Sequence, residues 1–229
     1  MPPAAPEPPP TRPGVVAAQL AFVVVAALLV YGFVAVTKEG EMRRECSAPC
    51  FLHPDYLAAE KKAPSFSLKD LNGTTVTLES LRGKVVVLNF WSKTCGPCLE
   101  EMPSLAELAQ VVRDRPDVAV IAVSIDEGPE DVNPTLKTVL RGPPPFQVLF
   151  DPDAKVVTGE YGTRLFPETW LLDKKGVIRA RFDGAREWNS PLVVNFIDAL
   201  RGGDYCPVKI DGKSLAGKAG GLCEEMSGT

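Results

Sequence analysis

The sequence predicts an α/β domain, with a mixed central sheet and helices on both faces, carried on an N-terminal transmembrane helix. Strand-like and helix-like segments alternate from residue 63 onward. They follow a run of 22 residues without charge, Val15–Val36, which is long enough to cross a membrane. A Cys-x-x-Cys pair, Cys95 and Cys98, comes shortly after the apolar run Val85–Trp91. That placement brings two thiols to the end of a buried strand.

The N-terminal region divides into an arm and an anchor. Residues 1–14 are rich in proline, which lacks a backbone donor, and they predict a disordered arm. As a helix, Val15–Val36 would span about 33 Å, which exceeds a hydrocarbon core of about 30 Å. We expect an uncleaved anchor, because the apolar region of a signal peptide is normally about 7 to 15 residues long.

Two signals on the orientation of the anchor disagree. Arg12 precedes the apolar run, and Lys38, Arg43 and Arg44 follow it, so charge alone would place the domain in the cytoplasm. Four of the six cysteines lie outside the predicted core, which favours an oxidising compartment. We expect the domain on the extracytoplasmic, periplasmic side. The net charge of −4, with no basic stripe, excludes nucleic acid as a partner.

Residues 37–62 form a predicted connector, residues 63–203 the folded domain and residues 204–229 a glycine-rich tail; connector and tail both contain cysteines. Asn72-Gly73 predicts a tight turn, and Pro103 predicts a kink in the first domain helix. Apolar periodicity gives the remaining elements. The predicted strands are Phe66–Leu71, Thr74–Leu78, Lys84–Phe90, Val118–Ile125, Gln147–Phe150, Glu168–Leu172 and Val177–Phe182, and the predicted helices are Cys95–Arg113, Pro129–Leu140 and Pro191–Leu200.

Five stretches, Ala63–Phe66, Gly83–Trp91, Cys95–Cys98, Glu100–Pro103 and Phe166–Asp173, resemble the membrane-anchored thioredoxin-like oxidoreductases of the TlpA or ResA family. The resemblance implies a thioredoxin-like fold on a membrane stalk. It also implies a thiol-disulfide oxidoreductase that acts on disulfides of other extracytoplasmic proteins, in several members apocytochromes c. Gly96-Pro97 between the cysteines is the pair found in thioredoxin, and we therefore expect the protein to reduce these disulfides with electrons from a membrane donor. The expected partners are therefore protein thiols and disulfides.

The Cys-x-x-Cys pair is expected to carry the exchange. A free thiol has a pKa of about 8.5, and unpaired N–H groups at a helix start stabilise its thiolate. Cys95 is therefore the predicted attacking residue and Cys98 the resolving one. A structural disulfide and half of a zinc site are the alternatives, but the chain has one histidine, His53, and no second Cys-x-x-Cys. We expect no metal, and no cofactor besides the redox-active disulfide.

Glu101 lies three residues after Cys98, on the same helical face, and is a candidate for exchanging protons with the thiols. The alternative is a solvated acid of the kind expected for Glu100. The resemblance favours the proton role. It further implies that the peptide bond before Pro167 is cis and that the backbone of the preceding residue pairs with substrate. Thr94 stands where family members commonly carry tryptophan. The predicted substrate contacts are Thr94, Gly96, Pro97, Phe166 and Pro167.

The other four cysteines, Cys46, Cys50, Cys206 and Cys223, are candidates for structural disulfides, and three pairings are open. Cys46 and Cys50 with His53 would also form a soft ligand set suited to copper. The alternative functions are thus a copper-binding assembly factor on the same scaffold and a peroxiredoxin-like peroxidase.

The peroxidase needs a Pro-x-x-x-Thr/Ser-x-x-Cys run before its reactive cysteine. Ser92 fits the hydroxyl position, but Leu88 occupies the proline position.

Overall fold

The computed structural model describes residues 13–58, 60–212, 214–216 and 220–227 of the chain. The chain divides into two compact units with a boundary after Arg44. The predicted proline-rich arm lies outside the described residues, except for its last two positions.

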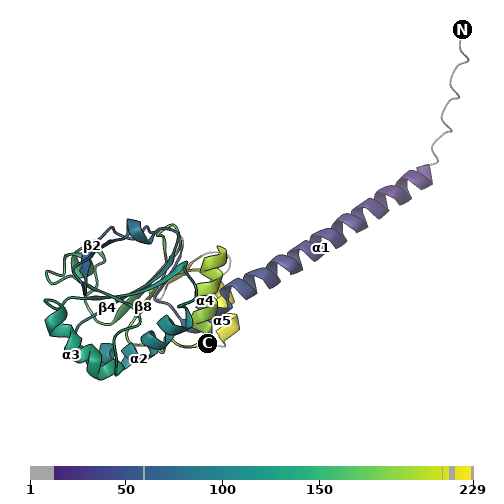
Figure 1. Ribbon diagram of the computed structural model, residues 1–229. Helices are drawn as coiled ribbons and strands as arrows, with labels where there is room; N and C mark the ends of the chain where they lie inside the picture. The colour runs from purple at the N-terminus through teal and green to yellow at the C-terminus, as the bar shows by residue number, and fades with distance from the viewer. Residues whose placement is uncertain (1–12, 59, 213, 217–219, 228–229) are drawn as a thin grey trace, which may run out of the picture. The chain divides into compact units, whose positions relative to one another are not determined.

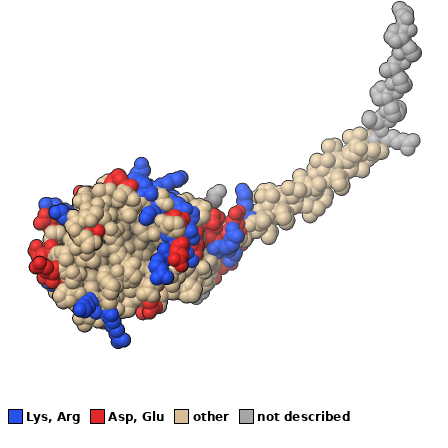
Figure 2. Space-filling view, viewed as in Figure 1, with Lys and Arg blue, Asp and Glu red and all other residues tan. Residues whose placement is uncertain are grey.

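The first unit is described as the long N-terminal part of helix α1 (Pro13–Leu52). This helix is long and apolar enough to cross a membrane, and the large apolar side chains between Val15 and Val36 are exposed. Figure 2 shows a continuous uncharged surface along this part of the helix. Val15–Val36 is therefore a candidate membrane span, and its orientation stays a prediction.

Helix α1 continues past the predicted span, and its last turns belong to the second unit. It ends at Leu52 because His53 adopts a left-handed conformation, with φ of 49°. The His53 N–H donates to the Pro49 carbonyl at 3.2 Å, and Pro54 cannot continue the helix. The second unit begins at Glu45, so part of the predicted connector, and the described part of the tail, belong to the folded domain.

The described strands form one mixed sheet in the order β10-β9-β1-β8-β7-β4-β5-β6-β2-β3. The central strand β4 is fully buried, pairs in parallel with β5 and pairs antiparallel with β7. Strands β1, β9 and β10 were not predicted. They are too short for a clear apolar period, and they lie in the connector and tail. The strands are β1 (Tyr56–Leu57), β2 (Ser67–Asp70), β3 (Thr75–Thr77), β4 (Val85–Trp91), β5 (Val118–Ser124), β6 (Gln147–Phe150), β7 (Glu168–Leu172), β8 (Ile178–Asp183), β9 (Lys209–Asp211) and β10 (Ser214–Ala216).

Helical segments cover both faces of this sheet, as predicted. One face carries Val86, Leu88 and Phe90, which pack into an apolar core with Val157 and Tyr161. Val157 lies in a π-helix, η2 (Lys155–Glu160), and Tyr161 directly follows it. The opposite face carries Asn89 and is covered by α2 (Gly96–Val111) and α4 (Pro191–Gly202), with α3 (Pro129–Leu140) beside α2 (Figure 1). Helix α2 continues past Pro103 and ends two residues before the predicted boundary.

Two disulfides join the end of α1 to the tail. Cys46 bonds Cys206, and Cys50 bonds Cys223 in helix α5 (Gly220–Ser227). The structure therefore selects one of the three pairings. It is one of the two in which each bridge joins the connector to the tail. We call the last turns of α1 with β1 and the disulfide-bonded tail the terminal module (residues 45–58 and 203–227).

Removing both terminal bridges should lower stability strongly. Either bridge alone already joins the connector to the tail, so removing one opens a loop of about twenty residues and should cost about 3 kcal/mol. Removing the second opens the whole domain, because it links residues more than 150 positions apart, and should cost about 5 kcal/mol more. Denaturant unfolding of Cys46→Ser/Cys206→Ser, and of the variant that lacks all four cysteines, measures both steps.

The variant Cys95→Ser/Cys98→Ser is the matched control. Its bridge closes a loop of three positions, so its loss should change the unfolding free energy far less. Equal losses for the inner and the terminal pairs would contradict this account of the terminal module.

Candidate active site

The Cys-x-x-Cys pair lies at the start of helix α2. Cys95 is the N-cap residue, with an extended backbone, and its Sγ accepts the Cys98 N–H at 3.2 Å. Cys95 and Cys98 form a disulfide with a Cα–Cα distance of 5.2 Å. Cys98 is fully buried whereas Cys95 is partly exposed, and Gly96 and Pro97 between them are exposed. An incoming sulfur can therefore reach Cys95 but not Cys98.

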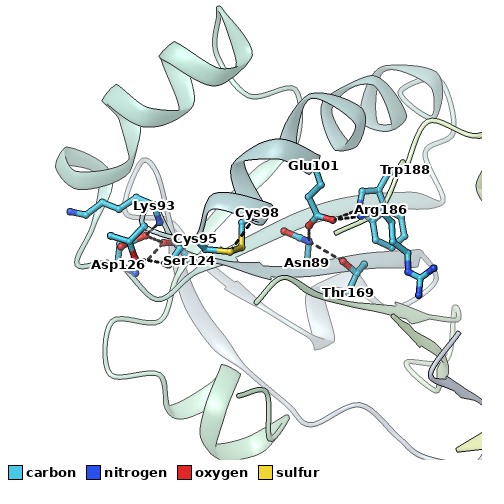
Figure 3. Close-up of a disulfide and its surroundings, with 12 residues drawn as sticks. Asn89, Lys93, Cys95, Cys98, Glu101, Ser124, Asp126, Thr169, Arg186 and Trp188 are labelled. Carbon is cyan, nitrogen blue, oxygen red and sulfur yellow. Dashed lines mark hydrogen bonds between the residues drawn. A yellow bond between two sulfur atoms is a disulfide. The ribbon is translucent and has the colours of Figure 1, made fainter. Parts of the chain in front are cut away.

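The loop that leads from β4 to Cys95 is fixed by the end of β5. Asp126 accepts the backbone N–H of Lys93 and the hydroxyl of Ser124, both at 2.7 Å. The hydroxyls of Ser92 and Thr94 lie 3.1 Å apart. Because β4 and β5 run in parallel, their carboxyl ends meet here, and Asp126 after β5 holds the loop through Lys93 (Figure 3). Thr94 itself is exposed.

Pro167 precedes β7, and its peptide bond with Phe166 is cis, as the resemblance implies. The register pairs Glu168 of β7 with Phe90 of β4. Pro167 therefore lies at the carboxyl end of β4, where the loop to Cys95 begins. Leu165, two residues earlier, is 83% exposed. The segment before β7 thus borders the end of the sheet that carries the two cysteines.

Glu101 lies one turn after Cys98 and is almost fully buried, with 2% of its surface exposed. Its Oε1 accepts the Asn89 amide at 2.7 Å, and its Oε2 accepts the Trp188 Nε1–H at 2.9 Å and the Arg186 backbone N–H at 3.0 Å (Figure 3). Burial raises the pKa of Glu101, and these hydrogen bonds oppose the rise. Glu101 is therefore not a solvated surface acid like Glu100, which was the alternative.

Three neighbours of Glu101 were not predicted as site residues. Asn89 is the one polar residue in the apolar strand Val85–Trp91, and that local signal could have identified it. Arg186 and Trp188 come from the loop between β8 and α4, more than 80 residues further along the chain. The loop docks on α2 through Ser104, whose hydroxyl donates to the Arg186 carbonyl at 3.2 Å and accepts the Trp188 N–H at 3.1 Å.

A second buried carboxyl, Glu168, lies on the opposite face of the sheet. It accepts the Trp170 Nε1–H at 2.8 Å and a hydrogen bond from the Thr163 hydroxyl. Burial raises its pKa as well. Glu168 therefore helps to hold the segment that leads to Phe166 and Pro167.

The ligand set suggested for copper is not assembled in this structure. Cys46 and Cys50 are each bonded to a tail cysteine, and His53 is exposed. Among the described residues, no three His, Cys, Asp or Glu side chains gather as a metal site would require. At the proline position of the peroxidase motif, Leu88 is fully buried inside β4.

Comparisons with known proteins point to one family. The model of the AhpC/TSA family matches residues 59–181. Thioredoxin-like protein YneN of Bacillus subtilis (strain 168) is 34% identical over 119 residues, which cover 52% of this chain and 68% of YneN. Thiol-disulfide oxidoreductase ResA of Bacillus thuringiensis (strain Al Hakam) is 34% identical over 128 residues, which cover 56% of this chain and 71% of ResA.

Solved structures agree. A protein assigned as thiol:disulfide interchange protein DsbE from Chlorobium tepidum has a TM-score of 0.54 and 30% identity, and the match covers 63% of this chain and 99% of that one. A protein assigned as a thioredoxin from Neisseria meningitidis has a TM-score of 0.51 and 35% identity, covering 62% and 91%. The range matched by the family model contains Cys95, Cys98, Glu101 and Pro167, but it ends before Arg186 and excludes the terminal module.

Glu101 should make stability depend on pH. Its pKa in the folded protein lies above the value of about 4.3 for an unfolded glutamate. The stabilisation is then complete below that value and is lost as pH rises through the folded pKa. In Glu101→Gln, the Asn89 amide can turn so that its unpaired Oδ1 accepts the new N–H. Relative to wild type, Glu101→Gln should therefore gain stability as pH rises from 5 to 8.

Denaturant unfolding of the oxidised protein at both pH values measures this gain, and Glu168 contributes equally to both proteins. Glu100→Gln is the control, because Glu100 is exposed and should show no such gain. A Glu101→Gln curve parallel to that of wild type would rule out a buried carboxyl with a raised pKa.

Proposed function

The chain belongs to the AhpC/TSA family and is a thiol-disulfide oxidoreductase of the ResA type, and on that premise we propose that it reduces disulfides of exported proteins outside the cytoplasm, through Cys95 and Cys98. One observation carries the proposal. A partly exposed Cys95, at the start of a helix, is bonded to a fully buried Cys98. This asymmetry distinguishes the sulfur that meets a substrate from the sulfur that resolves the complex.

The proposed reaction is two successive exchanges. The Cys95 thiolate attacks one sulfur of a substrate disulfide, forms a mixed disulfide and releases the other substrate sulfur as a thiolate, which takes up a proton. The Cys98 thiolate then attacks the Cys95 sulfur, restores the Cys95–Cys98 disulfide and releases the second substrate thiol. The substrate gains two electrons and two protons, and the protein loses them. A dithiol donor in the membrane would reverse the change by the same chemistry.

Neighbouring groups have distinct parts in this reaction. Backbone N–H groups at the start of α2 stabilise the Cys95 thiolate. Glu101, buried one turn beyond Cys98, accepts the proton that Cys98 must lose before it can attack. The backbone of Phe166, beside Pro167, is available to pair with an extended substrate segment. Exposed Thr94, Gly96 and Pro97 complete the contact surface.

Location and substrate class rest on two further features. The apolar span of α1 would hold the domain at a membrane. The terminal disulfides favour an oxidising compartment, because cytosolic thiols are kept reduced. Apocytochromes c, whose paired cysteines must be reduced before haem attachment, are the proposed example of a substrate.

Trapping tests the exchange directly. The variant Cys98→Ser cannot resolve the mixed disulfide, so the full chain in its own membranes should carry exported proteins covalently on Cys95. Mass spectrometry under non-reducing conditions identifies them. The variant Cys95→Ser/Cys98→Ser is the control and should capture none. If Cys98→Ser captures no more than this control, the protein does not exchange disulfides with exported partners.

The role of Glu101 predicts a change in the reactivity of the reduced protein. A carboxylate near the two sulfurs opposes thiolate formation, so Glu101→Gln should shift the pH profile of Cys95 alkylation to lower pH by about half a unit. Glu100→Gln, one position away but exposed, should leave the profile in place. A profile identical to wild type in Glu101→Gln would remove the proton role and leave the exchange reaction untouched.

A further inference from the structure

The loop between β8 and α4 connects Glu101 to the terminal module. Arg186 in this loop contacts both. Its backbone N–H donates to Glu101 Oε2 at 3.0 Å. Its guanidinium donates to the carbonyl of Leu52 at 3.1 Å and to that of His53 at 3.4 Å. One residue thus bridges the buried carboxyl and the last residues of α1.

The position of the guanidinium has a clear physical cause. The last carbonyls of a helix have no partner within it and form the negative end of its dipole. The Arg186 guanidinium donates to the carbonyl of Leu52, the last residue of α1, and to that of His53, which follows it. It also lies 3.7 Å from the Asp55 carboxylate and 5.0 Å from the Phe182 ring. Its contacts therefore depend on where the end of α1 lies.

The end of α1 is itself fixed covalently. Cys46 and Cys50 lie in its last two turns, and each is bonded to the tail. A continuous series of bonds and contacts then runs from the tail, through the two disulfides and the end of α1, to Arg186 and Glu101. The family match covers residues 59–181 and so includes neither the four terminal cysteines nor Arg186.

We propose that Arg186 is a positioning residue that couples the terminal module to Glu101, so that the two terminal disulfides set the ionisation of the buried carboxyl beneath the Cys95–Cys98 pair. The coupling is a matter of geometry and charge within the folded domain. Its consequence for disulfide exchange rests on the proton role of Glu101 in the proposed function.

The groups around Glu101 indicate the direction of the effect. Asn89 of β4 and Trp188 of the loop face the carboxyl as neutral donors, and Cys98 precedes it on α2. The positive charge of Arg186 lowers the pKa of Glu101, against the larger rise caused by burial. Removing that charge, or releasing the loop that holds its N–H, should therefore raise the pKa further.

Arg186 is faced by charged groups of its own. Asp55 lies beside the guanidinium. Arg186 also lines a cavity of about 360 Å³, and His53 and Glu187 line that cavity with it. The experiment must therefore follow the signal of Glu101 itself.

The test is a carboxyl ¹³C NMR titration of Glu101 in the full chain, in detergent micelles and with all three disulfides formed. Oxidised cysteines do not titrate, so the Glu101 signal is free of coupling to thiols. Its absence from the spectrum of Glu101→Gln assigns it. In Arg186→Gln, the midpoint should move to higher pH by about half a unit or more. Arg186→Lys keeps the charge, so the Glu101 midpoint should move less than in Arg186→Gln.

Arg201→Gln is the matched control. Arg201 is similarly exposed, but its ion pairs are with Asp117 and Asp198 and not with Asp55 or Glu101. Its loss should leave the Glu101 midpoint unchanged.

The variant without the four terminal cysteines tests the other end of the series. It should shift the Glu101 midpoint in the same direction as Arg186→Gln, and the two changes combined should give less than their sum, because both act through one contact. Full additivity would overturn the coupling. An equal Glu101 midpoint in wild type and Arg186→Gln would also overturn it. That second comparison does not require the cysteine variant to fold.

The titration involves no turnover, so it separates this proposal from the proposed function. A shifted midpoint with no captured substrates would support the coupling and refute the function. Captured substrates with an unshifted midpoint would support the function and refute the coupling.

Discussion

The site depends on one buried strand, β4. Each of its residues is buried, and it is hydrogen-bonded on both sides, in parallel to β5 and antiparallel to β7. Its carboxyl end leads into the loop to Cys95, and its Asn89 donates a hydrogen bond to Glu101. Its pairing with β7 brings Pro167 to the same edge of the sheet. A shift of register in β4 would therefore separate all parts of the site at once.

Burial divides the site into an accessible part and an inaccessible part. Cys98 and Glu101 follow one another on the buried face of α2, whereas Cys95 is accessible. A carboxyl with few charges around it holds its proton to higher pH than a solvated one, which brings its titration toward the range in which thiols ionise. The loop that carries Arg186 and Trp188 closes this environment and ties it to the end of α1. The chemistry at the surface thus depends on contacts made well below it.

Much of the domain could be predicted because its signals are local. The apolar run of β4, the Cys-x-x-Cys spacing and the helical period after it lie within thirty residues of one another. The predictions of the fold and of the enzyme class were correct for that reason. Asn89 was equally visible, as a single amide in an apolar strand, and Glu101 was identified from its spacing to Cys98, but the contact between them could not be predicted from spacing alone.

The remaining features depend on contacts between distant parts of the chain. Arg186 and Trp188 lie in a polar loop with no motif, and only the packing of that loop on α2 gives them a function. The pairing of the terminal cysteines follows from where the tail crosses the end of α1, which spacing does not determine. Strands β1 and β9 pair with each other from opposite ends of the chain, so neither shows a pattern by itself.

We propose that the inner disulfide exchanges with partner proteins and that the terminal disulfides are structural. The most direct measurement is the redox state of all six cysteines after equilibration in glutathione buffers of graded potential, read by differential alkylation and mass spectrometry. The accessible Cys95–Cys98 pair should pass reversibly between disulfide and dithiol while both terminal pairs stay oxidised. Reduction of a terminal pair before Cys95–Cys98, or an inner pair that never exchanges with glutathione, would contradict the account.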